Sequence, residues 1–170
     1  FISKKDSKKY DKKEYLDKLE MLRNKEKKLK LAQPETFFNF GKTIENLKAK
    51  TVNFITNILN NKKIVLGLGA STKGNIILQH FGLTKNKIPY ISKRNPEKAG
   101  LKCLGSDIEL ISEEKARTIN PEAFIVLPWN FKKEIVKREK EYLNRGGKLM
   151  FVMPYPHVVT KNGEIKLWKK

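Results

Sequence analysis

Apolar residues follow two different periods along the chain. Up to about residue 60 they recur at helical spacing, sparsely in residues 15–31 and as a fuller stripe in residues 34–60. From residue 62 onward, short apolar runs alternate with amphipathic stretches. We therefore expect a helical arm or linker over residues 1–61, followed by an α/β domain over residues 62–157.

The second part of the chain alternates between two kinds of element. Its short apolar runs predict strands at residues 62–68, 87–93, 107–111, 123–129 and 148–154. Between them, helical patterns cover residues 71–81, 112–119 and 131–145. Strands that alternate with helices through short links indicate a Rossmann-like, doubly wound, mainly parallel sheet. In the tail, residues 158–170, the alternation around Asn162-Gly163 is a hairpin signal.

The first strand is followed by "GLGASTKGN", residues 67–75, which resembles two phosphate-binding loops and matches neither. The third glycine of a dinucleotide fingerprint comes late here, and the lysine precedes the last glycine instead of following it as in a P-loop. The segment still combines flexible glycines, hydroxyls, a cation and a helix N-terminus, which favours a phosphate or pyrophosphate. A tight turn whose glycines only allow close packing is the alternative. The candidate residues are Gly67, Gly69, Ser71, Lys73, Gly74 and Asn75.

Ligands of such sheets bind beyond the carboxyl ends of the strands, near the point where the strand order reverses. After the second strand, "SKRNPEKAG" lacks the acid that a nicotinamide-binding protein uses for the ribose hydroxyls. Lys93 and Arg94 suit a second phosphate instead, and Asn95 begins a turn; an exposed basic turn is an equal alternative. In "LPWNFKKE", Trp129 offers a flat face to a base or sugar, and Asn130 suits a helix cap or a ligand contact. Packing at the rim is the plainer interpretation of this tryptophan.

The net charge of the chain does not change the predicted fold or site. A formal net charge of +19 invites a nucleic acid, but only five of the 37 basic residues are arginines. Arginine is the side chain usually chosen for bidentate phosphate and base contacts. Because the lysines are spread along the whole chain, we expect a basic surface and no nucleic-acid partner.

Several further classes of protein are excluded by what the sequence lacks. No run of about 18 apolar residues predicts a membrane span, and no signal peptide is visible, so we expect a cytoplasmic protein. The lone Cys103 excludes an internal disulfide and a thiolate zinc cage. His80 and His157 form no recognisable constellation with a nucleophile or a pair of acids. We therefore expect no metal site and no catalytic residue.

Four stretches, in order, resemble one family: "GLGASTKGNIILQHFGL", "IPYISKRNPEKAGLKCLG", "ISEEKARTINPEAFIVLPWNF" and "EYLNRGGKLMFVMP". They are similar to the C-terminal domain of the S-adenosylmethionine-dependent C-methyltransferases that act on nucleotide-linked deoxysugars. The similarity runs from about residue 62 to residue 156, and residues 34–61 also look similar.

The resemblance implies a division of labour. In that family a zinc module and a central domain come first, and the central domain binds the methyl donor and supplies the catalytic base. The C-terminal domain helps to hold the nucleotide sugar. This chain would then bind no cofactor and catalyse nothing alone, with S-adenosylmethionine implied for the full-length parent. Its expected partners are a nucleotide-sugar substrate and a methyltransferase domain in the same or a partner chain.

Within that family, the loop at residues 67–75 would hold the nucleotide diphosphate or a neighbouring part of the ligand. Lys93 departs from the acid common before "RNP" in the family, which points to an altered ligand. The alternative function is a stand-alone Rossmann domain that binds a phosphorylated cofactor, with NADP favoured over NAD by Lys93 and Arg94. The position of the third glycine argues against this alternative.

Overall fold

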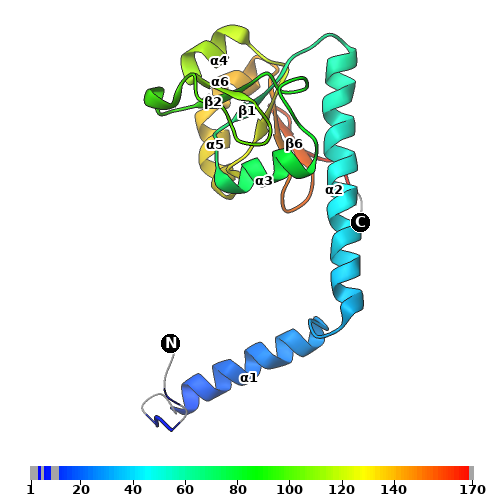
Figure 1. The fold of residues 1–170 in the computed structure, drawn as a ribbon, viewed down its shortest axis with the longest axis vertical. Helices are drawn as coiled ribbons and strands as arrows, with labels where there is room; N and C mark the ends of the chain where they lie inside the picture. The colour runs from blue at the N-terminus through cyan, green and yellow to red at the C-terminus, as the bar shows by residue number, and fades with distance from the viewer. Residues whose placement is uncertain (1–3, 5, 9–11, 169–170) are drawn as a thin grey trace. The chain divides into compact units, whose positions relative to one another are not determined.

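The computed structural model describes residues 4, 6–8 and 12–168 (Figure 1). Contacts divide the chain into two compact units, Phe1–Glu45 and Asn46–Lys170. The boundary between these units falls inside a helix. The division into an arm, an α/β domain and a tail that the sequence predicts stays a prediction.

The first unit contains helix α1 (Lys13–Lys28) and the beginning of helix α2 (Pro34–Asn60), as the helical spacing predicts. Pro34 takes the first position of α2 and Glu35 lies in its first turn, where the helix dipole favours an acid. No residue of α1 is buried. Large apolar side chains of this unit are exposed, namely those of Tyr15, Leu16, Leu19, Met21, Leu22, Leu29, Leu31, Phe37, Phe38 and Phe40.

The second half of α2 belongs to the second unit. It buries Leu47, Thr51, Ile55 and Ile58, which follow one another at helical spacing. The fuller apolar stripe of the sequence is therefore a packing face over this half of the helix.

The second unit is built on one seven-stranded sheet of order β3-β2-β1-β4-β5-β6-β7. Its strands are β1 (Val65–Leu68), β2 (Tyr90–Lys93), β3 (Glu109–Ser112), β4 (Ala123–Val126), β5 (Lys148–Phe151), β6 (His157–Thr160) and β7 (Gly163–Lys166). The first five are parallel, and β6 and β7 are antiparallel to their neighbours. The predicted fold class is confirmed. The strand order reverses between β1 and β4, which flank the switch point of the sheet.

Helices connect β1 to β2, β3 to β4 and β4 to β5, and the central strands β1 and β4 are buried on both faces. The helices are α3 (Thr72–His80), α4 (Glu113–Ile119), α5 (Lys132–Arg138) and α6 (Lys140–Asn144). On one face, Leu66, Phe124 and Leu149 form a core with residues of α4, α5 and α6. The alternate residues Val65 and Ile125 point to the other face and are fully buried as well. Continuous apolar runs in the sequence reflect this burial on two sides.

One helix expected from the sequence is divided in two. The pattern over residues 131–145 predicts a single helix, but α5 and α6 are separated at Glu139. The carboxylate of Glu139 is buried and forms ion pairs with Arg117 at 3.1 Å and with Arg138 at 3.0 Å. Burial of this paired acid accompanies the break, and Arg117 comes from the preceding helix α4.

The chain ends in a hairpin that extends the sheet. Residues Lys161 and Asn162 connect β6 to β7, with Thr160 opposite Gly163. Gly163 has a φ of 113°, a conformation that glycine adopts more readily than other residues. None of the described helices is long and apolar enough to cross a membrane.

Candidate functional site

Two adjoining hollows lie at the carboxyl edge of the sheet, beside the switch point. The first, here the charged pocket, has a volume of about 370 Å³ and is lined by Leu68, Gly69, Ala70, Lys93, Arg94, Glu113, Pro128, Phe131, Glu134, Ile135 and Arg138. The second, here the tryptophan pocket, has a volume of about 300 Å³ and is lined by Ser71, Thr72, Lys73, Leu127, Pro128, Trp129, Asn130 and Phe131. Pro128 and Phe131 line both hollows, which therefore share a wall, and the two hollows together are here called the cleft.

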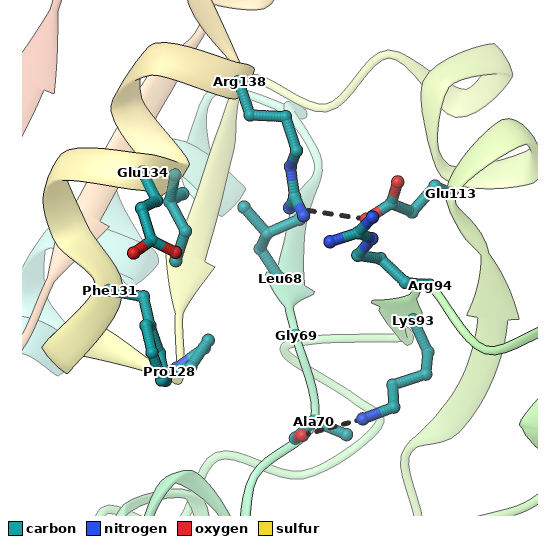
Figure 2. Close-up of a pocket in the computed structure, with 11 residues that line it drawn as sticks. Leu68, Gly69, Ala70, Lys93, Arg94, Glu113, Pro128, Phe131, Glu134 and Arg138 are labelled. Carbon is teal, nitrogen blue, oxygen red and sulfur yellow. Dashed lines mark hydrogen bonds and ion pairs between the residues drawn. The ribbon is translucent and has the colours of Figure 1, made fainter.

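The charged pocket has two different walls (Figure 2). Phe131 and Glu134 lie on one wall, and Arg94 and Glu113 lie on the opposite one. An ion pair of 3.3 Å between Arg138 and Glu113 links the walls. Among the residues that the structure describes, Arg94 and Glu134 have no ion-pair partner. Their charges are therefore available to a ligand.

Lys93 connects two of the loops that form the charged pocket. It ends β2, and its ammonium group donates a hydrogen bond to the carbonyl oxygen of Ala70 at 3.2 Å. Ala70 belongs to the loop between β1 and α3, so Lys93 ties this loop to the end of β2. A carboxylate at this position has no proton to donate to that carbonyl at neutral pH.

The tryptophan pocket lies between the N-terminus of α3 and the segment after β4. Trp129 is half-buried in a short 3-10 turn, η2 (Trp129–Phe131), and Asn130 in the same turn is exposed. Lys73, in the first turn of α3, is exposed. The lining of this pocket thus combines an aromatic ring with a cation and a positive helix end.

Hydrogen bonds within the chain occupy part of the first loop. Ser71 is the N-cap of α3, and its hydroxyl accepts from the Gly74 N–H at 3.0 Å and donates to the Leu127 carbonyl at 3.4 Å. The N–H groups of Thr72 and Lys73 lie in the first turn, where a helix makes no internal bonds. The loop thus offers these two groups, the Thr72 hydroxyl and the Lys73 ammonium to an anion.

Two of the predicted glycines serve packing. A Cβ atom on Gly67 would lie 2.6 Å from Ile91 Cγ1, and one on Gly74 would lie 2.5 Å from Leu127 Cβ. Both positions therefore allow close approach between neighbouring elements, and neither lines the cleft. Gly69 does line it, with a φ of 76° that favours glycine.

The structure brings six of the ten predicted residues together in the cleft. Gly69 and Arg94 line the charged pocket, and the tryptophan pocket contains Ser71, Lys73, Trp129 and Asn130. The other two polar candidates make hydrogen bonds within the protein. Asn75 donates to the carbonyl of Leu104 at 3.2 Å, and the side-chain oxygen of Asn95 accepts from the Glu97 N–H at 3.0 Å.

Sequence reasoning missed much of the β4 side of the cleft. Phe131, Glu134, Ile135 and Arg138 all line the charged pocket. The last three follow Phe131 by three, four and seven residues, from the N-cap of α5 to its last residue. This spacing puts them on one helical face, so the sequence alone could have grouped them. Glu113 directly follows β3, so it too stands at a strand's carboxyl end.

The described residues offer no thiolate and no metal cluster. Burial raises the pKa of the Cys103 thiol more than nearby Lys93 lowers it, so the thiol stays protonated and is a poor nucleophile. Among the described residues, no group of three or more His, Cys, Asp or Glu side chains could hold a metal ion. The cleft can bind and orient a ligand through charge, hydrogen bonds and aromatic faces.

A five-stranded parallel core with a cleft at its switch point defines a Rossmann-like α/β domain. Residues 2–154 match the family model of the C-methyltransferase C-terminal domain. The chain therefore belongs to this family of C-methyltransferase domains, which confirms the resemblance seen in the sequence. The match also includes most of the helical region that precedes the sheet.

A comparison with one relative shows how much of that protein's length this chain matches. The chain is 32% identical over 130 residues to C-methyltransferase NovU from Streptomyces niveus. The aligned part covers 76% of this chain and 31% of that relative. The chain thus spans about a third of the length of the curated relative that it matches.

Proposed function

We propose that this chain is the substrate-recognition domain of a C-methyltransferase and holds a nucleotide-linked sugar in its cleft. The observation that carries the proposal is that the charged pocket and the tryptophan pocket adjoin at Pro128 and Phe131. A ligand that spans both pockets can then meet cations, free N–H groups and aromatic faces together. A nucleotide sugar combines an anionic diphosphate with a flat base and a hydroxylated ring, so its chemistry suits this set.

The parts of the cleft suit different parts of such a ligand. The first turn of α3, with Lys73, suits the diphosphate because N–H groups and the helix dipole both favour an anion. Arg94 supplies a second exposed cation. Phe131 and Trp129 offer flat faces to the base or the sugar ring, and the carboxylate of Glu134 accepts hydrogen bonds from N–H or O–H groups.

The methyl donor belongs to another domain in this proposal. S-adenosylmethionine supplies an electrophilic methyl group when it is bound in the parent enzyme. The residues of this cleft do not fit that cationic donor, because Lys93 and Arg94 stand at the end of β2 where an acid would hold ribose hydroxyls. We therefore assign to this chain the binding and orientation of the substrate and no step of methyl transfer.

The helical first unit suits contact with the methyltransferase domain. Its exposed apolar side chains include Phe37, Phe38 and Phe40, and each has more than half of its surface exposed, at 61%, 71% and 61%. The family match begins before these helices, at residue 2. Apolar side chains that belong to the family's domain and are exposed in the described part of the chain fit an interface with the remainder of the enzyme.

A stand-alone domain that binds NADP is the second candidate. The observation that favours it is the exposed Arg94, which has no ion-pair partner among the described residues and stands next to Lys93 at the end of β2. A 2′-phosphate is accommodated at this place in NADP-binding proteins. The packing role of Gly74 weighs against it, because the last glycine of the loop does not face the cleft.

Calorimetric titration tests both candidates. The ligands are thymidine diphosphate, a thymidine diphosphate sugar, S-adenosylmethionine and NADP, with Lys73→Ala as the cleft variant. Lys63→Ala is the matched control, because Lys63 lies before β1 and outside the cleft. We expect saturable binding of the two thymidine ligands, weakened in Lys73→Ala and unchanged in Lys63→Ala. Binding of NADP alone would establish the second candidate. Binding of none of the four ligands would contradict both candidates.

A further inference from the structure

A buried histidine joins the C-terminal hairpin to the segment that carries the cleft's aromatic rings. His157, the first residue of β6, is only 1% exposed. Its Nδ1 atom lies 2.7 Å from the carbonyl oxygen of Tyr155. A carbonyl can only accept, so Nδ1 carries the proton and Nε2 of the neutral ring is an acceptor. The ammonium group of Lys132, 2.7 Å away, donates to that Nε2.

Lys132 is held from three strands at once. Its ammonium group also donates to the carboxylate of Glu164 on β7 at 2.6 Å. It lies 5.5 Å from the centre of the Phe151 ring of β5, and this ring stacks on His157 at an interplanar angle of 10°. The second carboxylate oxygen of Glu164 accepts from the Tyr155 hydroxyl at 2.9 Å. The charged end of Lys132 thus has fixed partners on β5, β6 and β7.

The backbone of Lys132 is continuous with the cleft. Lys132 directly follows η2 and is the first residue of α5, and its N–H bonds to the carbonyl of Trp129. Trp129 and Phe131 line the cleft, whereas Lys132 does not. A side chain anchored in the hairpin therefore fixes a backbone position next to both aromatic rings.

We propose that Lys132, His157 and Glu164 form a clamp through which the β6–β7 hairpin positions Trp129 and Phe131 in the cleft. His157 and Glu164 follow the residues matched by the family model, which end at 154. The three are positioning residues. The consequence for ligand binding rests on the proposed function, but the clamp itself does not.

The clamp should respond to acid. The charged and titratable groups that face His157 are Lys132 of α5, Glu164 and Lys166 of β7, and the Tyr155 phenol before β6. Burial lowers the pKa of His157 and the Lys132 and Lys166 ammonium groups lower it further, against the opposing effects of the Tyr155 carbonyl and Glu164. Protonation removes the acceptor at Nε2 and puts two cations 2.7 Å apart. The clamp is therefore closed at neutral pH and releases Lys132 below the usual histidine pKa of about 6.5.

Fluorescence of Trp129 tests the clamp without any ligand. In a Trp168→Phe background, Trp129 is the remaining tryptophan. We expect its acrylamide quenching to rise as the pH falls from 8 to 5, in a step below about 6.5. In His157→Gln, whose side-chain oxygen can replace Nε2 as acceptor without titrating, the step should vanish. Lys132→Met should show high quenching at every pH, and Lys133→Met, next to it on the exposed surface, should match the parent.

The remaining outcomes separate the clamp from simple folding effects and from the proposed function. Circular dichroism checks that each variant is folded. Should Lys132→Met unfold, Glu164→Gln is the milder variant, because it removes the negative charge and keeps the size of the side chain. Folded Lys132→Met or Glu164→Gln with unchanged Trp129 quenching would overturn the clamp. Thymidine diphosphate should bind Lys132→Met about tenfold more weakly than the parent. If the parent binds none, the proposed function fails while the quenching result still decides the clamp.

Discussion

The two sides of the cleft are built on different principles. On the β1 side, residues 67–75, the conspicuous glycines and hydroxyls are mostly used inside the protein: Gly67 and Gly74 in packing, Ser71 as a helix cap. On the β4 side, residues 127–138, a segment without a recognisable motif presents aromatic rings and charged groups to the cleft. A loop with a conspicuous motif can therefore serve mainly to pack and cap neighbouring elements, while the start of an ordinary helix supplies much of the surface of the site.

The strongest test of this difference is a single methyl group on the β1 side. Gly74→Ala places a Cβ atom 2.5 Å from the side chain of Leu127, so we expect a loss of about 1–3 kcal/mol in the free energy of unfolding. Gly41→Ala is the matched control, because nothing lies within 4 Å of a Cβ there. It should be neutral or stabilise helix α2 by about 0.5–1 kcal/mol. Urea denaturation measures both, and a Gly74→Ala protein as stable as the parent would contradict the packing role.

The next effect is expected on the β4 side and in binding. Phe131→Ala removes the ring shared by both pockets, and base–aromatic stacking contributes about 1–3 kcal/mol per base. We expect thymidine diphosphate to bind at least about fivefold more weakly, measured by calorimetry. Because Phe131 is exposed, its loss should leave the urea midpoint almost unchanged. Equal affinity in Phe131→Ala and the parent would remove the β4 side from the ligand site.

A smaller effect is expected from the cation on the β1 side. Lys73→Ala keeps the N–H groups of the α3 N-terminus and removes only an exposed ammonium group, which salt screens strongly. We expect a loss of affinity of about threefold to tenfold at low salt that shrinks as salt is added. Lys63→Ala should show no such loss. Affinity of Lys73→Ala that is reduced equally at all salt concentrations would point to a structural change instead.

The same contrast explains what the sequence could predict. The strands follow from apolar runs and the fold from their alternation with helices, because burial on both faces leaves a direct trace in composition. The packing role of Gly74 could not be predicted from the sequence, because it depends on contact with Leu127. Leu127 is 53 positions away in the sequence and is brought close by the pairing of β1 with β4. The break at Glu139 likewise depends on Arg117 of another helix.

The side chains that close the cleft show a second limit. The helical spacing of Phe131, Glu134 and Arg138 was present in the sequence, but it marks a core face as often as a ligand site. Only the position of α5 after the central strand β4 turns this face toward the pocket. The contact between Lys132 and His157 joins residues 25 apart, and its geometry comes from the antiparallel return of β6.

The smallest expected difference between the two sides of the cleft is their response to low pH. The pKa of His157 in the folded protein is below its usual value. At pH values between the pKa of the folded state and that of the unfolded state, His157 is therefore protonated mainly in the unfolded chain. Stability should therefore fall as the pH drops below about 6.5, and His157→Gln should flatten this part of the profile. The pKa of Glu164 is also lowered, chiefly by its hydrogen bond with Lys132, so its contribution is lost at still lower pH. Hydrogen exchange at pH 7.5 and 5.5 locates the change: η2 and the hairpin should lose protection, and the amides of α3 should keep theirs after correction for intrinsic rates. Equal loss of amide protection in α3 and in η2 would contradict a specific link between the hairpin and the β4 side.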